Sequence, residues 1–135
     1  MKNPLAVRKV VETGVYVTDL DAARDFYTRV LGLELYSSEP NRHVFLKAGK
    51  SMLLLFLAAT TLQEKRLPAH GASGIQHFAF EIDDADYDSW KARLSREGVA
   101  ITKEVNWGKA RSVYFDDPSG NVVELITKGN WPVDD

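Results

Sequence analysis

The sequence predicts an α+β fold in which one order of elements, a strand, a helix and three further strands, occurs twice. The segment Val17-Thr18-Asp19 recurs 65 residues later as Ile82-Asp83-Asp84. Both helical patterns end at a glycine, and short strand patterns separated by turn residues follow each of them. A repeat of this length indicates two units whose curved sheets, when paired, enclose a cleft.

The first strand is predicted over residues 10–18, where apolar and polar side chains alternate. Val11, Val15 and Val17 share one face with Thr13, whereas Glu12, Gly14 and Tyr16 occupy the other face. The valine face is the one that we expect to pack into the core.

The helix of the first unit is predicted over residues 21–31 from the spacing of its apolar side chains. Thr18 stands three residues before Asp21, which is the spacing of a capping box, and Gly32 ends the helix. The three strands that follow are predicted at residues 34–38, 42–48 and 51–58.

The second unit follows residues 60–74, a segment without periodicity whose proline and glycines indicate a linker. The strand predicted over residues 75–82 places Phe78 and Phe80 on an apolar face and His77 on the opposite face. We expect the His77 face to open into a cavity. The remaining elements are a helix at residues 85–97 and strands at residues 99–103, 111–115 and 121–127.

A chain of 135 residues is long enough to form one domain with its own core, and we predict a single domain over residues 1–135. Its predicted parts are unit one at about residues 8–59, the linker at about 60–74, unit two at about 75–128 and a tail at 129–135.

Composition excludes several classes of function. A formal net charge of -2 offers no basic surface for nucleic acid. Because the chain has no cysteine, disulfides, thiolate catalysis and cysteine-ligated metals are excluded. The apolar run at residues 51–59 is shorter than the roughly 18 residues that a membrane span needs, and the first residues hold too short an apolar run for a signal peptide. We therefore expect a cytoplasmic protein that acts on small molecules and binds neither nucleic acid nor membrane.

Three polar residues lie among apolar neighbours on predicted strands: Glu12, His77 and Glu124. A carboxylate that points inward from an apolar strand has a large desolvation cost unless a cation or several donors meet it. Two carboxylates and a neutral imidazole in one cleft are a ligand set for a divalent cation. The alternatives are a solvent-facing Glu12 on an edge strand, an exposed Glu124 on a half-buried strand and a structural, hydrogen-bonded His77.

Three longer stretches carry a resemblance to a known family. They are VYVTDLDAARDFYTRVLGLEL at residues 15–35, IQHFAFEIDD at 75–84 and VYFDDPSGNVVEL at 113–125. Together they resemble the signature segments of the vicinal oxygen chelate superfamily, which contains glyoxalase I, bleomycin-resistance proteins, fosfomycin-resistance enzymes and extradiol dioxygenases. The resemblance spans about residues 10–128. It implies a glyoxalase-like domain of two βαβββ units that form a U-shaped mixed sheet around a metal cleft.

The resemblance implies that Glu12, His77 and Glu124 bind a divalent metal, with Glu12 and Glu124 as the catalytic carboxylates. Zn, Ni, Mn and Fe(II) all suit this ligand set. Glyoxalase I has a further acidic ligand in the last strand of its first unit, where this chain has Ser51, Met52 and leucines. Bleomycin-resistance proteins lack the ligand set and bind their drug without metal.

Six residues around the implied metal are predicted to contact substrate: Tyr16, Phe45, Phe56, Trp107, Arg111 and Tyr114. Arg111 can clamp a carboxylate, phosphate or phosphonate through two parallel hydrogen bonds, and the alternative is a surface ion pair with nearby acids. His43 and His70 are additional candidates for proton transfer or metal binding, and the alternative for His70 is a solvated loop position.

We expect a metal-dependent lyase or isomerase that chelates adjacent oxygens of a small metabolite. The alternatives are a non-catalytic binding protein for a drug-like or aromatic molecule and an extradiol dioxygenase. The resemblance also implies a homodimer, either side by side or with exchanged units, whose site can draw residues from both subunits. This hypothesis requires the three ligands to come within about 8 Å of one another, in one chain or across two.

Overall fold

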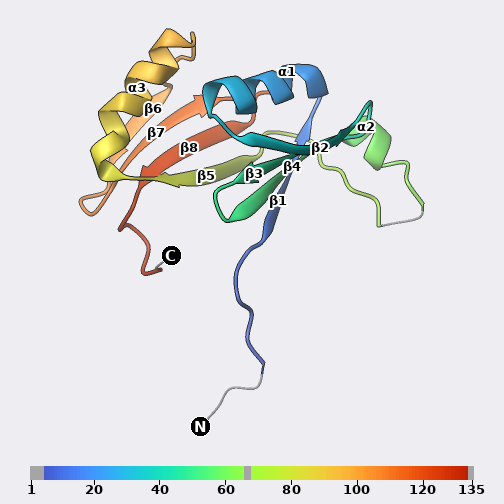
Figure 1. Ribbon diagram of the computed structural model, residues 1–135, viewed down its shortest axis with the longest axis horizontal. Coiled ribbons are helices and arrows are strands. Elements are labelled where there is room, and N and C mark those ends of the chain that lie inside the picture. Colours follow the sequence, from blue (N-terminus) through green and yellow to red (C-terminus); the bar gives the residue numbers. More distant parts are fainter. Residues whose placement is uncertain (1–4, 66–67, 134–135) are drawn as a thin grey trace.

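The computed structural model describes residues 5–65 and 68–133, which form two βαβββ units (Figure 1). The α+β class and the repeated order of elements predicted from the sequence are confirmed. Residues 1–4 of the predicted domain, 66–67 of the predicted linker and 134–135 of the predicted tail lie outside the described residues. Within the described ranges, no helix has both the length and the apolar character needed to cross a membrane.

Each unit builds one four-stranded mixed sheet. The first unit contains β1 (Glu12–Val17), α1 (Leu20–Asp25), a π-helical segment (Phe26–Val30), β2 (Glu34–Glu39), β3 (His43–Ala48), β4 (Ser51–Leu57) and the single turn α2 (Ala58–Thr61). The second contains β5 (His77–Ile82), a 3-10 turn (Asp84–Asp86), α3 (Tyr87–Arg96), β6 (Lys103–Asn106), β7 (Arg111–Asp116) and β8 (Val122–Thr127). The strand orders are β1-β4-β3-β2 and β5-β8-β7-β6, so that the first strand of each unit lies at an edge of its sheet. It runs parallel to the last strand of the unit, and the other pairs are antiparallel.

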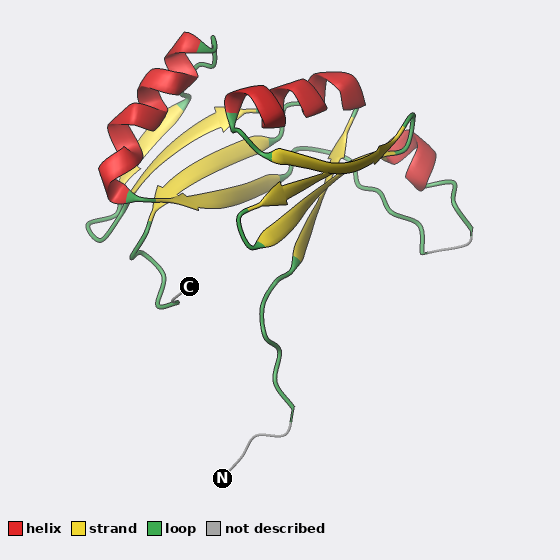
Figure 2. Ribbon diagram, in the orientation of Figure 1, coloured by secondary structure: helices red, strands yellow, loops and turns green. Residues whose placement is uncertain are grey.

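Alternating burial along the strands gives each sheet a core face and an open face. In β1, Val15 and Val17 are buried, whereas Glu12 on the other face is exposed. In β5, Ile82 is buried and His77 is exposed. Figure 2 shows α1 and α3 on the same side of the two sheets, and buried side chains of both helices join those of the strands in one core. The open face of each sheet is therefore the surface opposite the helices.

The start of the first helix differs from the prediction. Asp19, and not Thr18, caps this helix, because its Oδ1 accepts a hydrogen bond from the backbone N–H of Ala22 at 3.0 Å. The Thr18 hydroxyl lies 3.4 Å from Ser119 Oγ instead. A carboxylate is a stronger acceptor than a hydroxyl at the positive end of a helix, which favours the aspartate.

The strand predicted over residues 99–103 is misplaced. The observed strand β6 begins at Lys103, which pairs with Tyr114 of β7. Val99 and Ile101 instead pack as partly buried residues against the core without ladder partners. The alternation of apolar and polar residues at 99–103 arises because Val99 and Ile101 pack on the core, and it cannot be distinguished from that of a strand.

Hydrogen bonds join the units at several points of the described chain, and two of these points bear on the site. The side-chain amide of Gln76 accepts from the backbone N–H of Tyr16 at 2.9 Å and donates to the Tyr16 carbonyl at 3.4 Å. The Tyr27 hydroxyl of the first unit donates to Asp117 Oδ2 of the second unit at 2.8 Å. The two sheets thus meet where Gln76, just before β5, contacts the Tyr16 end of β1.

Candidate metal centre

His77 and Glu124 come together on the open face of the second sheet. Strand β5 runs parallel to β8 in a register that places Ala79 opposite Glu124. His77 and Ala79 point to the same face because they are two residues apart on a strand. His77 Nε2 lies 3.2 Å from Glu124 Oε1. Two of the three predicted ligands are therefore neighbours in one chain.

The imidazole of His77 is also held through its other nitrogen. Nδ1 lies 3.2 Å from the backbone oxygen of Val122, which can only accept a hydrogen bond. The proton of a neutral imidazole then sits on Nδ1, and Nε2 carries a lone pair. A second hydrogen bond of this kind is what typically orients metal-binding histidines. The side chain is 52% exposed, so that Nε2 can be reached from the open face.

The second oxygen of Glu124 ends a chain of two hydrogen bonds. Ser112 Oγ donates to Glu124 Oε2 at 2.5 Å, and Trp107 Nε1 donates to Ser112 Oγ at 2.9 Å. Since the indole N–H can only donate, Ser112 Oγ accepts from Trp107 and its own proton goes to Glu124. Oε2 is therefore engaged, and Oε1 is the oxygen that faces His77.

Glu124 is a buried carboxylate, with a side chain only 8% exposed. Tyr114 lies opposite it in the ladder between β7 and β8. Burial, followed by the charge of Glu124, raises the pKa of the Tyr114 hydroxyl above its usual value. Tyr114 consequently keeps its proton at neutral pH and remains a hydrogen-bond donor beside Glu124.

A comparison with Asp117, the other buried carboxylate of the described residues, shows what is unusual about Glu124. Both oxygens of Asp117 accept hydrogen bonds, from the Tyr27 hydroxyl, the Asn121 amide and two backbone N–H groups. One oxygen of Glu124 instead faces the imidazole of His77, 3.2 Å from Nε2. A cation between Nε2 and Oε1 would stabilise both groups.

The distance between the two ligand atoms fits a divalent cation. Metal–nitrogen and metal–oxygen bonds of about 2.1 Å that meet at octahedral or tetrahedral angles hold two ligand atoms roughly 3.0–3.4 Å apart. The separation of 3.2 Å between His77 Nε2 and Glu124 Oε1 lies in this range. One imidazole and one carboxylate oxygen also leave coordination positions for a third ligand and a substrate.

Glu12 does not join this pair within one chain. Among the described residues, no three His, Cys, Asp or Glu side chains are grouped so that they could hold a metal. Gln76, the neighbour of His77, contacts Tyr16. Glu12 precedes Tyr16 by four residues on β1, so that roughly 13 Å of extended strand separates Glu12 from this contact. The three-ligand centre predicted from the sequence is therefore incomplete in the described part of a single chain.

The open face of the first sheet carries a cluster of rings, the aromatic face, formed by Tyr16, His43, Phe45, Phe56 and His70. The Phe56 ring lies at its centre, with its centroid 5.9 Å from Tyr16, 5.7 Å from Phe45 and 5.3 Å from His70. His43 stacks on Phe45 at 3.9 Å. Tyr16, Phe45 and Phe56, which were predicted to contact substrate, thus lie together on one face, with Tyr16 and Phe45 partly exposed and Phe56 itself buried at 4% exposure.

The polar groups at the edge of the aromatic face leave it largely uncharged. Arg42 Nη1 lies 2.6 Å from His43 Nδ1, and this nitrogen must accept because a guanidinium can only donate. Burial, followed by the charge of Arg42, lowers the pKa of His43 below 6.5. Arg42 itself donates two parallel hydrogen bonds to Glu64 at 2.7 and 2.9 Å. His43 is therefore neutral at pH 7, and the charge of Arg42 is paired.

Arg111 does not reach the candidate site. Its guanidinium lies 3.0 Å from Asp84 Oδ1 and covers the ring of Tyr87, with Cζ 4.1 Å from the ring centroid. Tyr87 belongs to α3, so Arg111 lies on the helix-covered face of the sheet, opposite Glu124. The structure shows the ion pair that was the alternative, and the predicted clamp for an anionic substrate is not formed.

Trp107 and Tyr114 do lie beside Glu124, but Ser112 between them was not predicted. It is fully buried and contacts both Trp107 and Glu124. The available signal was its position two residues before Tyr114, which puts both residues on the same face of a strand. A serine on an apolar strand is too common to stand out without its neighbours.

The chain shares sequence and fold with known proteins. Residues 9–125 match the family model of the Glyoxalase/Bleomycin resistance protein/Dioxygenase superfamily. The chain is 31% identical over 121 residues to the metallothiol transferase FosB of Staphylococcus epidermidis, across 82% of this chain and 75% of that protein. It is 29% identical over 109 residues to the glutathione transferase FosA of Serratia marcescens, across 81% of this chain and 73% of that protein.

A solved structure agrees with these matches. The crystal structure of lactoylglutathione lyase from Agrobacterium tumefaciens superimposes with a TM-score of 0.91 and 38% sequence identity, and covers 96% of this chain and 100% of that one. Since the family model spans most of the chain and the paired βαβββ units are present, the protein belongs to the glyoxalase/bleomycin resistance protein/dioxygenase superfamily.

Proposed function

We propose that the protein is a divalent-metal-dependent enzyme that binds adjacent oxygens of a small substrate. The observation that carries this proposal is the approach of His77 Nε2 and Glu124 Oε1 to 3.2 Å, with each residue oriented by a further hydrogen bond. The third ligand would be Glu12 of the partner subunit in a homodimer, because one chain leaves the centre incomplete. Zn, Ni, Mn and Fe(II) all suit two carboxylates and an imidazole.

The relatives support an enzymatic role. Their names include a metallothiol transferase, a glutathione transferase and a lactoylglutathione lyase. We favour a lyase or isomerase, since the lyase structure is 38% identical and spans nearly the whole chain. The absence of an acid from β4 (Ser51–Leu57) argues that the reaction differs from that of lactoylglutathione lyase itself, which is glyoxalase I and uses an acidic ligand in this strand, so this relative supports the class of reaction and not its substrate.

Each residue of the site has a role that follows from its contacts. When bound, the ion would polarise the substrate oxygens and stabilise negative charge on them. Ser112 keeps one oxygen of Glu124 engaged, so that the carboxylate presents a single oxygen. Tyr114 is a protonated donor next to Glu124 at neutral pH. Glu12 is the exposed carboxylate of the set, and we propose that it exchanges a proton with the substrate.

The aromatic face supports a proposal for the rest of the substrate. Its central ring, Phe56, is surrounded by other rings, the lowered pKa keeps the His43 imidazole neutral, and the neighbouring Arg42 guanidinium is paired with Glu64. Such a wall favours a planar or apolar substrate body over a highly charged one. The same wall favours the second candidate function, a binding protein for an aromatic molecule that needs no metal.

Metal titration tests the first proposal and separates it from the second. Protein stripped with EDTA is titrated with Mn²⁺ by calorimetry, and bound metal is counted by mass spectrometry. We expect about one ion per chain, and a loss of affinity of more than about 100-fold in His77→Ala and in Glu124→Gln, because each removes a direct ligand. Glu81→Gln is the matched control, since Glu81 is exposed on the same face of β5.

Two results would contradict the metal-dependent enzyme. The first is an affinity of His77→Ala and Glu124→Gln equal to that of the parent protein. The second is stabilisation by an aromatic ligand that persists unchanged after EDTA treatment, which would assign the site to metal-free binding.

A further inference from the structure

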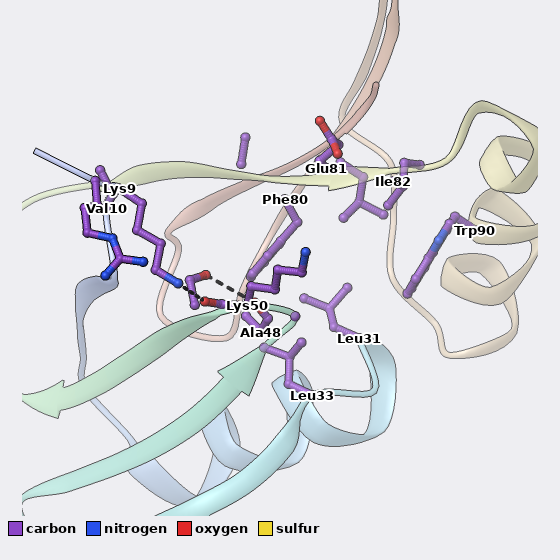
Figure 3. A pocket seen from close by; sticks show the side chains of 15 residues that line it. Lys9, Val10, Leu31, Leu33, Ala48, Lys50, Phe80, Glu81, Ile82 and Trp90 are labelled. Atoms are coloured by element: carbon purple, nitrogen blue, oxygen red, sulfur yellow. Dashed lines mark hydrogen bonds between the residues drawn. The ribbon is translucent and has the colours of Figure 1, made fainter. Parts of the chain in front are cut away.

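A pocket of about 830 Å³ lies between the two units, away from the candidate metal centre. Its walls come from the segment before β1, the turn between β3 and β4, the end of the first helix, β5 and α3. Figure 3 shows this pocket with Lys50 near its middle. A volume of this size is in the usual range of about 300–1,000 Å³ for small-molecule sites.

One end of the pocket is apolar. Leu31, Leu33 and Ile82 line it together with the indole of Trp90. Leu33, Phe80 and Trp90 pack against the core but remain partly exposed. Apolar surface that stays in contact with water favours an apolar ligand, because binding removes that surface from water.

The other end of the pocket is basic. Arg8 and Lys9 line it, Lys50 follows toward the middle of the pocket, and Lys9 Nζ donates to the backbone carbonyl of Lys50 at 3.1 Å. This hydrogen bond ties the segment before β1 to the turn between β3 and β4. Glu81 contributes the one acidic residue of the lining. Figure 3 shows its carboxylate pointing away from Lys50, on the opposite face of β5 from Phe80.

The pocket is distinct from the candidate metal centre. Phe80 and Ile82 line it from the core face of β5, and Ala79 and Glu81 line it from the face that carries His77, nearer the other end of the strand. Neither His77 nor Glu124 is among the residues that form the pocket. A ligand in the pocket would therefore touch both units without contacting the proposed metal ligands.

We propose that this pocket binds a small amphipathic organic anion, a carboxylate on an apolar chain or ring. Arg8 and Lys9 at one end, with Lys50 near the middle, fit the carboxylate, and the leucines and Trp90 at the other end fit the apolar body. An inorganic anion would leave the apolar end in water. An amphipathic cation would be repelled at the basic end.

Calorimetry with octanoate and octylammonium tests this proposal, because the two probes share a tail and differ in the sign of the head group. We expect octanoate to bind with a stoichiometry of about one per chain and octylammonium to show no saturable binding. Lys50→Gln should weaken octanoate binding about fivefold, and combining it with Arg8→Gln and Lys9→Gln should weaken it by on the order of 50-fold. Lys109→Gln, a neutralised exposed lysine outside the pocket, should bind octanoate like the parent protein.

The experiment is repeated after treatment with EDTA, and octanoate affinity should be the same because the pocket does not include the metal ligands. Equal affinity for octanoate and octylammonium, no saturable octanoate binding, or unchanged affinity in the triple variant would each overturn the proposal. Loss of octanoate binding on chelation would also overturn it, since the anion would then be bound at the metal.

Discussion

At the scale of single residues, Ser112 decides how Glu124 presents its carboxylate. Its Oγ lies 2.5 Å from Glu124 Oε2, and the indole N–H of Trp107 occupies the acceptor side of the same hydroxyl. A carboxylate held in this way offers one oxygen to a cation, whereas an unconstrained carboxylate rotates and can offer two. We therefore propose that Ser112 and Trp107 are positioning residues, which would act on a metal through Glu124.

Ser112→Ala is expected to lower the affinity for Mn²⁺ by about 10- to 100-fold, the usual effect of removing a hydrogen bond to a metal ligand. Calorimetric titration of the stripped protein measures this change. Ser112→Thr, which keeps the hydroxyl, should restore most of the affinity, and Ser38→Ala on the exposed part of β2 is a control that should change nothing. If Ser112→Ala binds Mn²⁺ as tightly as the parent protein, the serine does not orient Glu124.

The sequence identifies some of these residues and misses others for one physical reason. His77 and Glu124 can be found because each is an isolated polar residue on a strongly apolar strand. The pairing of Ser112 with Glu124 depends on which strands are neighbours in the sheet, and strand order is a property of the tertiary structure. Arg111 shows the same limit, because strand alternation cannot tell that α3 covers its face.

At the scale of elements, the first helical region of unit one is hydrogen-bonded to the turn between β7 and β8 of unit two. Tyr27 lies in the π-helical segment Phe26–Val30, and Asp117 lies in the turn between β7 and β8. The Tyr27 hydroxyl donates to Asp117 Oδ2 at 2.8 Å, and Oδ1 of the same carboxylate accepts from the backbone N–H of Asn121 at 2.8 Å. Burial, followed by the charge of Asp117, raises the pKa of Tyr27. The hydroxyl is therefore a donor throughout the neutral range, and it holds the first helix to this turn.

Tyr27→Phe should lower the free energy of unfolding by about 1–3 kcal/mol, because Asp117 stays buried and loses a donor. Urea denaturation followed by circular dichroism measures the change. Tyr36→Phe is the matched control, because Tyr36 is 67% exposed and its variant should stay within about 0.5 kcal/mol of the parent protein. A Tyr27→Phe effect as small as that of the control would show that the hydrogen bond does not stabilise the junction of the units.

The existence of most elements can be predicted from the sequence, and their ends are harder to predict. Periodicity and glycine stops locate the strands and helices because these signals are local. Val99 and Ile101 mislead because a loop that packs on the core produces the same apolar alternation as a strand. The cap at Asp19 is missed because Thr18 and Asp19 both suit an N-cap, and the choice depends on the contact of Thr18 with Ser119.

At the scale of the whole molecule, one chain presents two incomplete sites. The second sheet offers His77 and Glu124, and the first sheet offers Glu12 and the aromatic face. The hydrogen bond between Gln76 and Tyr16 sets the relative position of the two sheets. In this position Glu12 does not reach His77 and Glu124 among the described residues of one chain. Since both sheets have open faces, a second copy can place its first sheet against the second sheet of this chain. In this proposed arrangement a homodimer would contain two complete sites, each with residues from both chains.

Mixed dimers test this arrangement directly. One chain carries Glu12→Ala, and the other carries His77→Ala with Glu124→Gln. If sites are shared between subunits, each homodimer has no complete site, but the mixed dimer has one site with all three native ligands and one with none. We expect the mixed dimer, isolated through two different affinity tags, to bind about one Mn²⁺ per dimer with the affinity of the parent protein.

The outcome separates a shared site from a site within one chain, because the mixed dimer regains a native set of ligands only when the ligands come from different chains. If all ligands came from the same chain, every site would keep a defect and no binding would return. A parent protein that light scattering shows to be monomeric while it binds one Mn²⁺ per chain would also rule out the shared site. In that case the two sheets of one chain would have to rearrange around the metal, since their contact at Gln76 and Tyr16 leaves Glu12 outside the pair.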